Sequence, residues 1–155
     1  MGSARNTIMN AVVTAIKTAT VSGGYNYDLA DDSGTEHVYL GNEYPPPIYP
    51  CVLVQPKGRP SDYGLELTYY TRRQEFQIVA FAEGTGGRGG SIVAAQNLAD
   101  DIEKTLEADR SLGGLVDDLI YSDRYENGAD FDASLTDIGL MVCNLLVTYR
   151  ERGGA

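Results

Sequence analysis

The sequence is poor in the residues that most catalytic and metal sites require. It contains one histidine, two cysteines and no tryptophan among 155 residues. Cys51 and Cys143 form no C-x-x-C pair, so they predict neither a zinc site, a redox motif nor a disulfide framework. Both lie in apolar, strand-like runs, and we expect them to be buried. His37 would have to serve any Ser-His-Asp triad, yet the chain has no G-x-S-x-G motif, and we interpret this residue as an exposed strand histidine.

These shortages predict a protein without catalytic residues, metal ligands or cofactor-binding residues, and therefore one that is not an enzyme. Long apolar runs are absent as well. The N-terminus has no apolar signal region, and no stretch reaches the length of a membrane-spanning helix. We expect a protein that is made in the cytoplasm, keeps its thiols reduced and has no membrane partner.

Basic residues are also scarce. Twelve Lys and Arg residues stand against 22 Asp and Glu residues, which gives a net charge of -10. A protein that binds nucleic acid by neutralising phosphates needs clustered cations, so the composition argues against that class. An acidic surface would suit a protein that must not adhere to passing DNA, although simple solubility explains the charge as well.

Two segments have helical periodicity. The first covers Asn6 to Thr20, and the second begins at Ser91 and ends at Asp109 to Ser111. Six residues of the second segment form one apolar stripe: Ile92, Ala95, Leu98, Ala99, Ile102 and Leu106. In the following Leu112–Val116, two glycines can take positive φ while the leucines and the valine hold the turn against the core.

The remaining segments favour strands. Leu65–Thr71 and Arg73–Ala82 are predicted either as a strand pair or as one long bent strand, and Pro56–Pro60 as a turn or projecting loop. The other expected strands are Tyr25–Asp32, Glu36–Leu40, Cys51–Gln55, Leu119–Asn127, Ala129–Ala133 and Gly139–Arg150, with tight turns at Ser33-Gly34 and Asn127-Gly128. A polyproline-like connector is expected at Tyr44–Pro50.

The order of helix, strands, helix and strands predicts an α+β fold: a mainly antiparallel β-sheet with two main α-helices packed on it. We expect one domain over residues 1–155, with a flexible tail at about 151–155. In the last strand, the face that includes Met141 and Val147 is wholly apolar, whereas the face with Asn144 and Leu146 is half apolar. A central strand has this pattern, and so does a strand covered by a neighbouring subunit.

One glycine-rich segment suggests a nucleotide-binding loop. Gly84–Gly89 matches G-x-G-x-x-G between a strand and a helix, and Gly84–Ser91 resembles a P-loop. However, Gly90 stands where the phosphate-contacting lysine would be, and the strands do not alternate with helices as a parallel nucleotide-binding sheet requires. We interpret the segment as a loop that orders on assembly, with nucleotide binding as the alternative.

Three segments together resemble a known family. They are the P-x-V-x-V pattern at Pro50–Val54, the helix-to-turn run Ile102–Val116 and the closing strand Val147–Arg150. The arrangement resembles the tail-terminator and tail-completion proteins of tailed bacteriophages, a group of minor tail and head–tail joining proteins. The likeness extends over Thr7–Arg150 in pattern and is sharpest over Leu98–Leu119.

The resemblance implies a structural virion protein that caps the tail tube and forms the interface to the head–neck complex. It implies a homo-oligomeric ring of six copies through which DNA passes without sequence-specific contact, with the tail tube protein and the neck or head-completion protein as partners. The long insertion at Asp28–Pro50 departs from the family pattern and leaves open a neck or head-completion role. An adaptor that uses its tyrosine-rich edge outside any virus is a further alternative.

The candidate interface residues follow from three features. Separated cations favour ion pairs between subunits over a phosphate track, the last strand has a half-apolar face, and tyrosine, with eleven copies here, is enriched in interfaces. The candidates for contact with another subunit or the tube are Tyr63, Arg72, Arg73, Arg88, Asn144, Leu146 and Arg150.

Overall fold

The computed structural model describes residues 4–32, 35–40, 49–65, 69–84, 90–128 and 138–152. Its elements are α1 (Ala4–Ile16), β1 (Val38–Leu40), β2 (Cys51–Leu65), β3 (Tyr69–Glu83), α2 (Gly90–Ala108), β4 (Asp118–Gly128) and β5 (Ile138–Arg152). They form one five-stranded sheet in the order β1-β2-β3-β5-β4. The β1–β2 pair is parallel and the other pairs are antiparallel, so the predicted α+β fold with a mainly antiparallel sheet is confirmed.

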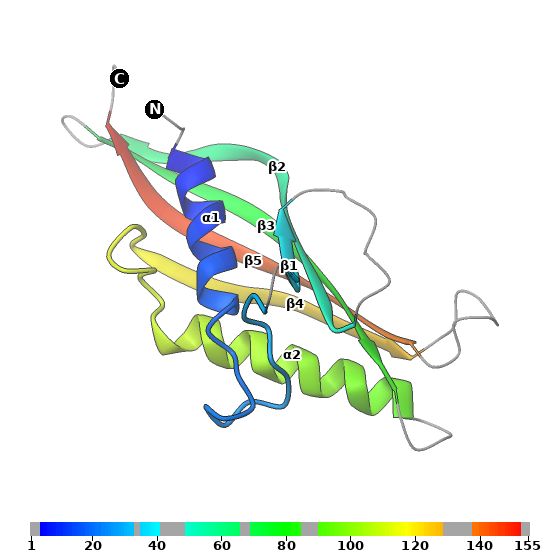
Figure 1. Ribbon diagram of the computed structural model, residues 1–155. Coiled ribbons are helices and arrows are strands. Elements are labelled where there is room, and N and C mark those ends of the chain that lie inside the picture. Colours follow the sequence, from blue (N-terminus) through cyan, green and yellow to red (C-terminus); the bar gives the residue numbers. More distant parts are fainter. Residues whose placement is uncertain are drawn as a thin grey trace.

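Both helices lie on the same side of the sheet (Figure 1). Side chains alternate between the two faces of each strand, and those beneath the helices are apolar and buried. They include Phe76, Ile78 and Ala80 of β3 and Met141 and Leu145 of β5. In α2, the residues Ala95, Leu98, Ala99, Ile102 and Leu106 are fully buried, as the stripe predicted. No helix in the described part of the chain is long and apolar enough to cross a membrane.

The prediction for Ile92 was wrong, because this residue is 45% exposed. Ile92 lies in the first turn of α2, whereas Ala99, two turns further along the same side, is fully buried. The buried face of α2 also contains the polar residues Asp101 and Thr105. The Asp101 carboxylate accepts hydrogen bonds from the backbone N–H of Asn26 at 2.9 Å and of Tyr27 at 2.8 Å. It also accepts one from the Asn26 side chain at 3.1 Å. These hydrogen bonds tie the segment after α1 to a polar side chain on the buried face of α2.

The predicted end of β2 at Gln55 was wrong. Residues 56–60, predicted as a turn or loop, continue the strand, which pairs with β3 as far as Leu65 and shifts register between Lys57 and Ser61. β1 pairs with β2 only at residues 52–54, so within the described chain β2 is an edge strand at Pro56. An edge position tolerates proline, whose missing N–H would interrupt a ladder inside a sheet.

Other boundaries also differ. Tyr69–Glu83 is one long strand, which was one of the two predicted alternatives. Asn127 and Gly128 continue the β4 ladder opposite Leu140 and Gly139, so the predicted turn is wrong and the connection falls in residues 129–137, outside the described residues.

Helix α1 ends at Ile16 rather than Thr20. Residues 151 and 152 were predicted as tail but pair with Tyr70 and Tyr69. The polyproline-like connector lies mostly outside the described residues.

Leu106→Asp should prevent folding, because Leu106 is fully buried between α2 and the sheet. An unpaired charge there costs about 4–5 kcal/mol or more, a large part of a typical stability of about 5–15 kcal/mol. Soluble yield and far-UV circular dichroism measure the effect. Gln96→Asp, at an exposed position of the same helix, is the matched control and should fold normally. Normal folding of the Leu106 variant would contradict the assigned helix face.

Candidate interaction surfaces

The described residues contain no group of three or more His, Cys, Asp or Glu side chains that could hold a metal ion. Both cysteines are buried, as predicted, and burial raises the pKa of the Cys51 thiol to about 11. This thiol is therefore protonated at neutral pH and is a poor nucleophile. His37 is half-buried in a bend before β1, with Nδ1 2.8 Å from the carbonyl oxygen of Pro50, so the prediction of an exposed strand histidine was wrong.

The surroundings of the glycine-rich loop also differ from those of a nucleotide site. Residues 85–89 lie outside the described residues, and α2 begins at Gly90. The strands before and after α2, β3 and β4, are separated by β5, which runs antiparallel to both. A dinucleotide-binding unit instead places its two parallel strands side by side.

The side of the sheet away from the helices forms a candidate surface, which we call the open face. Its residues alternate with the core residues along each strand and are half-buried in most cases. No described helix contributes to it. The register places on it Cys51, Leu53, Gln55 and Lys57 of β2, Arg73, Glu75, Gln77, Val79 and Phe81 of β3, Leu140, Val142, Asn144, Leu146, Thr148 and Arg150 of β5, and Asp118 and Ile120 of β4.

The open face changes character along the strands. At one end it is apolar, where Leu53, Val79 and Val142 stand side by side in register, next to the row of Phe81 and Leu140. A row of amides follows, in which the Gln55 side chain donates to Gln77 at 2.7 Å and Asn144 stands opposite Gln77. An apolar area beside amide groups has the composition of a protein–protein contact.

The other end of the open face is charged. Lys57 lies 3.8 Å from Glu75, and Arg150 lies 3.5 Å from Asp117. Arg73 stands opposite Thr148, and Leu146 stands opposite Ile120, which is 42% exposed. Exposed ion pairs of this kind stabilise a fold by about 0–1 kcal/mol, so their charges matter more for recognition than for stability.

Four predicted interface residues meet on the open face: Arg73, Asn144, Leu146 and Arg150. Arg72 lies on the opposite face, in register with the buried Tyr149. Tyr63 belongs to β2 but its side chain lies outside the description, and Arg88 lies outside the described residues. Val79 and Phe81 were missed, although their alternation with the buried Ile78 and Ala80 was visible in the sequence.

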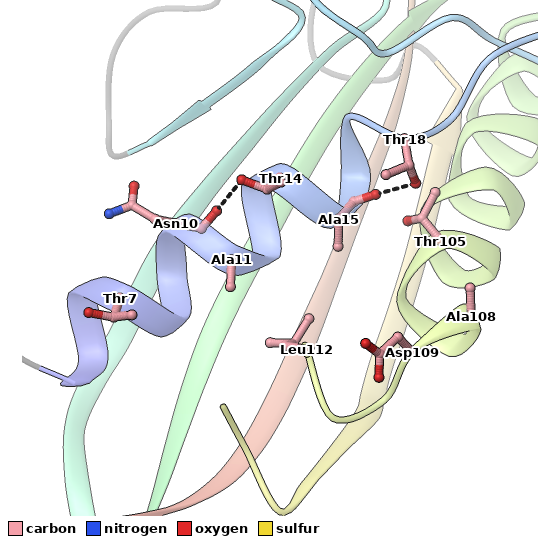
Figure 2. A pocket seen from close by; sticks show the side chains of 10 residues that line it. All are labelled: Thr7, Asn10, Ala11, Thr14, Ala15, Thr18, Thr105, Ala108, Asp109 and Leu112. Atoms are coloured by element: carbon pink, nitrogen blue, oxygen red, sulfur yellow. Dashed lines mark hydrogen bonds between the residues drawn. The ribbon is translucent and has the colours of Figure 1, made fainter. Parts of the chain in front are cut away.

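A groove of about 540 Å³ lies between α1 and the C-terminal end of α2 (Figure 2). Its walls are mostly alanine and threonine, and Asp109 is the one charged residue among those that line it. The hydroxyl of Thr14 donates to the Asn10 carbonyl at 3.0 Å, and that of Thr18 donates to the Ala15 carbonyl at 2.6 Å. Because these hydroxyls bond to their own helix, the groove favours an apolar occupant over a charged one.

A left-handed turn closes one end of this groove. Leu112, Gly113 and Gly114 have φ values of 50°, 72° and 89°, so the predicted positive φ of both glycines is confirmed. Leu112 and Val116 are buried as expected, but Leu115 is 44% exposed, so its predicted role in holding the turn was wrong.

The Asp109 carboxylate holds the turn. It accepts hydrogen bonds from the Ser111 hydroxyl at 2.7 Å, the Ser111 N–H at 3.1 Å and the Gly113 N–H at 2.8 Å. These bonds lower the pKa of the Asp109 carboxyl, the largest effect coming from the Ser111 side chain. The turn thereby places Leu112 against the core even though a leucine is strained at positive φ.

Comparison with known proteins gives little further information. No family model and no curated protein matches the sequence. Among solved structures, a similar chain comes from "Virion of native gene transfer agent (GTA) particle", with a TM-score of 0.48 and 12% sequence identity. The similarity covers 92% of this chain and 94% of that chain. A similarity of this degree identifies neither a family nor a function.

Asp109→Asn should lower the melting temperature at pH 7, because a neutral amide accepts the three turn hydrogen bonds less strongly. The folded pKa of Asp109 is depressed, so its contribution is fully present above the ordinary value of 3.8 and is lost as pH falls through the lowered pKa. The difference between the two proteins should therefore vanish in acid.

Thermal melts from neutral to acidic pH measure this difference. Glu107→Gln is the control, since it removes an exposed negative charge from the same helix end without touching the turn. Equal losses for the two variants at pH 7, or a difference that grows toward acid, would contradict the assigned role of Asp109.

Proposed function

We propose that this chain is a structural virion protein that acts as a tail terminator. In this role it assembles as a six-membered ring on the tail tube, contacts the neck or head-completion protein and lets DNA pass through its lumen. It is made in the host cytoplasm, functions in the virion and carries no enzymatic activity. The proposal starts from the resemblance of Ile102–Val116 and Val147–Arg150 to the tail-terminator family.

The open face is the observation that carries the proposal. Four strands, β2 to β5, contribute residues to it, yet the described helices cover only the opposite side of the sheet. A half-apolar face of this extent is unusual for a protein that remains a monomer, and it is expected for one whose neighbour covers it. The family resemblance implies such a neighbour, namely an identical copy in a ring.

The turn and the charge support the same proposal. The helix-to-turn run with the sharpest family likeness includes the C-terminal part of α2. This helix packs on β3, β4 and β5 from the side opposite the open face, so it leaves the open face uncovered. The net charge of -10 favours repulsion of DNA, as a lumen through which DNA must slide requires.

Val142→Lys should impair assembly while the subunit stays folded. Val142 is half-buried at the apolar end of the open face, beside Val79, where a lysine ammonium can still reach water in the free subunit. In a covered interface the same charge would be desolvated. Sedimentation velocity and attachment to tail tubes, seen by electron microscopy, measure the effect.

The matched control is Val21→Lys, at a position 55% exposed in the segment after α1. It should assemble and attach like the unmodified protein. An unmodified protein that stays monomeric at all concentrations and never attaches to tail tubes would refute the proposed function.

A further inference from the structure

The basic residues of this acidic chain are concentrated at one end of the sheet. Residues 57–65 of β2, 69–75 of β3 and 148–152 of β5 hold six of the twelve Lys and Arg residues but three of the 22 Asp and Glu residues. We call this region the basic end. Its cations are Lys57, Arg59, Arg72, Arg73, Arg150 and Arg152.

Strand register brings these positions together although they are far apart in the sequence. Asp62 pairs with Arg72, Arg72 with Tyr149, and Thr71 with Arg150. β4 begins at Asp118, opposite Thr148, so the last residues of β5 extend beyond it with β2 and β3. In Figure 1 this three-stranded end projects past α2. Lys57 and Arg150 also form ion pairs within the chain, with Glu75 and Asp117. Cations still outnumber carboxylates at this end by six to three, so its net charge is positive and favours an acidic partner.

The chain carries such an acidic surface on α2 and the turn that follows. Residues 90–118 contain two basic residues and seven Asp and Glu residues, of which Asp101 is buried and Asp117 pairs with Arg150 of the basic end. Both basic side chains are engaged: Lys104 lies 4.5 Å over the Tyr25 ring, and Arg110 lies 3.2 Å from Asp118. Glu103 and Glu107 are one helical turn apart on the side of α2 away from its buried stripe. We call this side the acidic face of α2.

We propose that the basic end of one copy docks on the acidic face of α2 in the next copy. This inference rests on the proposed function only in requiring that identical copies assemble. The acidic face belongs to α2 and the basic end to β2, β3 and β5, so each copy offers both halves of the contact. A contact between unlike surfaces is heterologous, and repeating it generates a ring when the rotation closes.

Electrostatics favour a second copy over nucleic acid as the occupant. Copies with a charge of -10 repel one another unless their opposite charges meet, and the docking pairs the positive region of each copy with a negative one. A polyanion that approached the basic end would instead face the repulsion of the remaining chain. Because the charges are exposed, the contact should weaken as salt is added.

Paired charge reversals test the docking. One variant carries Arg73→Glu and Arg150→Glu, and a second carries Glu103→Lys and Glu107→Lys. Each variant alone presents two surfaces of like charge and should lose assembly under conditions where the unmodified protein assembles. An equimolar mixture should regain assembly, with the two variants alternating and only even numbers of copies. Native mass spectrometry counts the copies of each variant in every assembly.

Glu83→Lys, at an exposed position beyond the apolar end of β3, is the control and should assemble normally. Circular dichroism confirms that each variant is folded. If the unmodified protein assembles and both reversed variants assemble equally well alone, the docking proposal is overturned while the proposed function stands. An unmodified protein that never assembles overturns both. Normal assembly of the arginine variant, combined with loss of duplex DNA binding, would identify the basic end as a polyanion site and overturn the docking.

Discussion

The packing of α2 on one side of the sheet is the constraint on which the rest of this structure depends. Five fully buried side chains form the contact, and each contributes about 1.5–3 kcal/mol when its size is that of leucine or isoleucine, and less for alanine. Because strand residues alternate between faces, this contact determines which residues of β3 and β5 enter the core. The residues between them, among them Val79 and Val142, necessarily face the other side. The open face is thus a direct consequence of the core.

The open face is half apolar, and charge is distributed unevenly over the molecule. The apolar and amide rows of the open face can contact a neighbour without burying unpaired charge, while the basic end and the acidic face of α2 provide complementary charges at separate places. This distribution is the basis of the proposed contact between identical copies. In the described residues, the carboxylates of Asp101 and Asp109 accept hydrogen bonds from backbone N–H groups, so both side chains stabilise the fold.

Sequence patterns predicted the long elements because one periodicity dominates each of them. Five of the six residues in the α2 stripe, the alternation in β5 and the burial of Cys51 and Cys143 were correct for this reason. The errors arose where tertiary contacts override local preference. Pro56 continues a strand because it lies at an edge, and Ile92 is exposed in the first turn of α2 although Ala99 on the same side is buried. Arg72 and Arg73 are adjacent in sequence, and only the register assigns them to opposite faces. The basic end could not be recognised beforehand, since it depends on the pairing of three strands.

The central claim is that the open face becomes an interface between subunits, and hydroxyl-radical footprinting tests it most directly. The protein would be labelled in its dissociated and assembled states, and oxidation of individual side chains measured by mass spectrometry. We predict that Phe81, Val142 and Leu146 lose most of their labelling on assembly, while the labelling of Val21, on the segment after α1, stays unchanged. Equal labelling of the open face in both states would contradict the account.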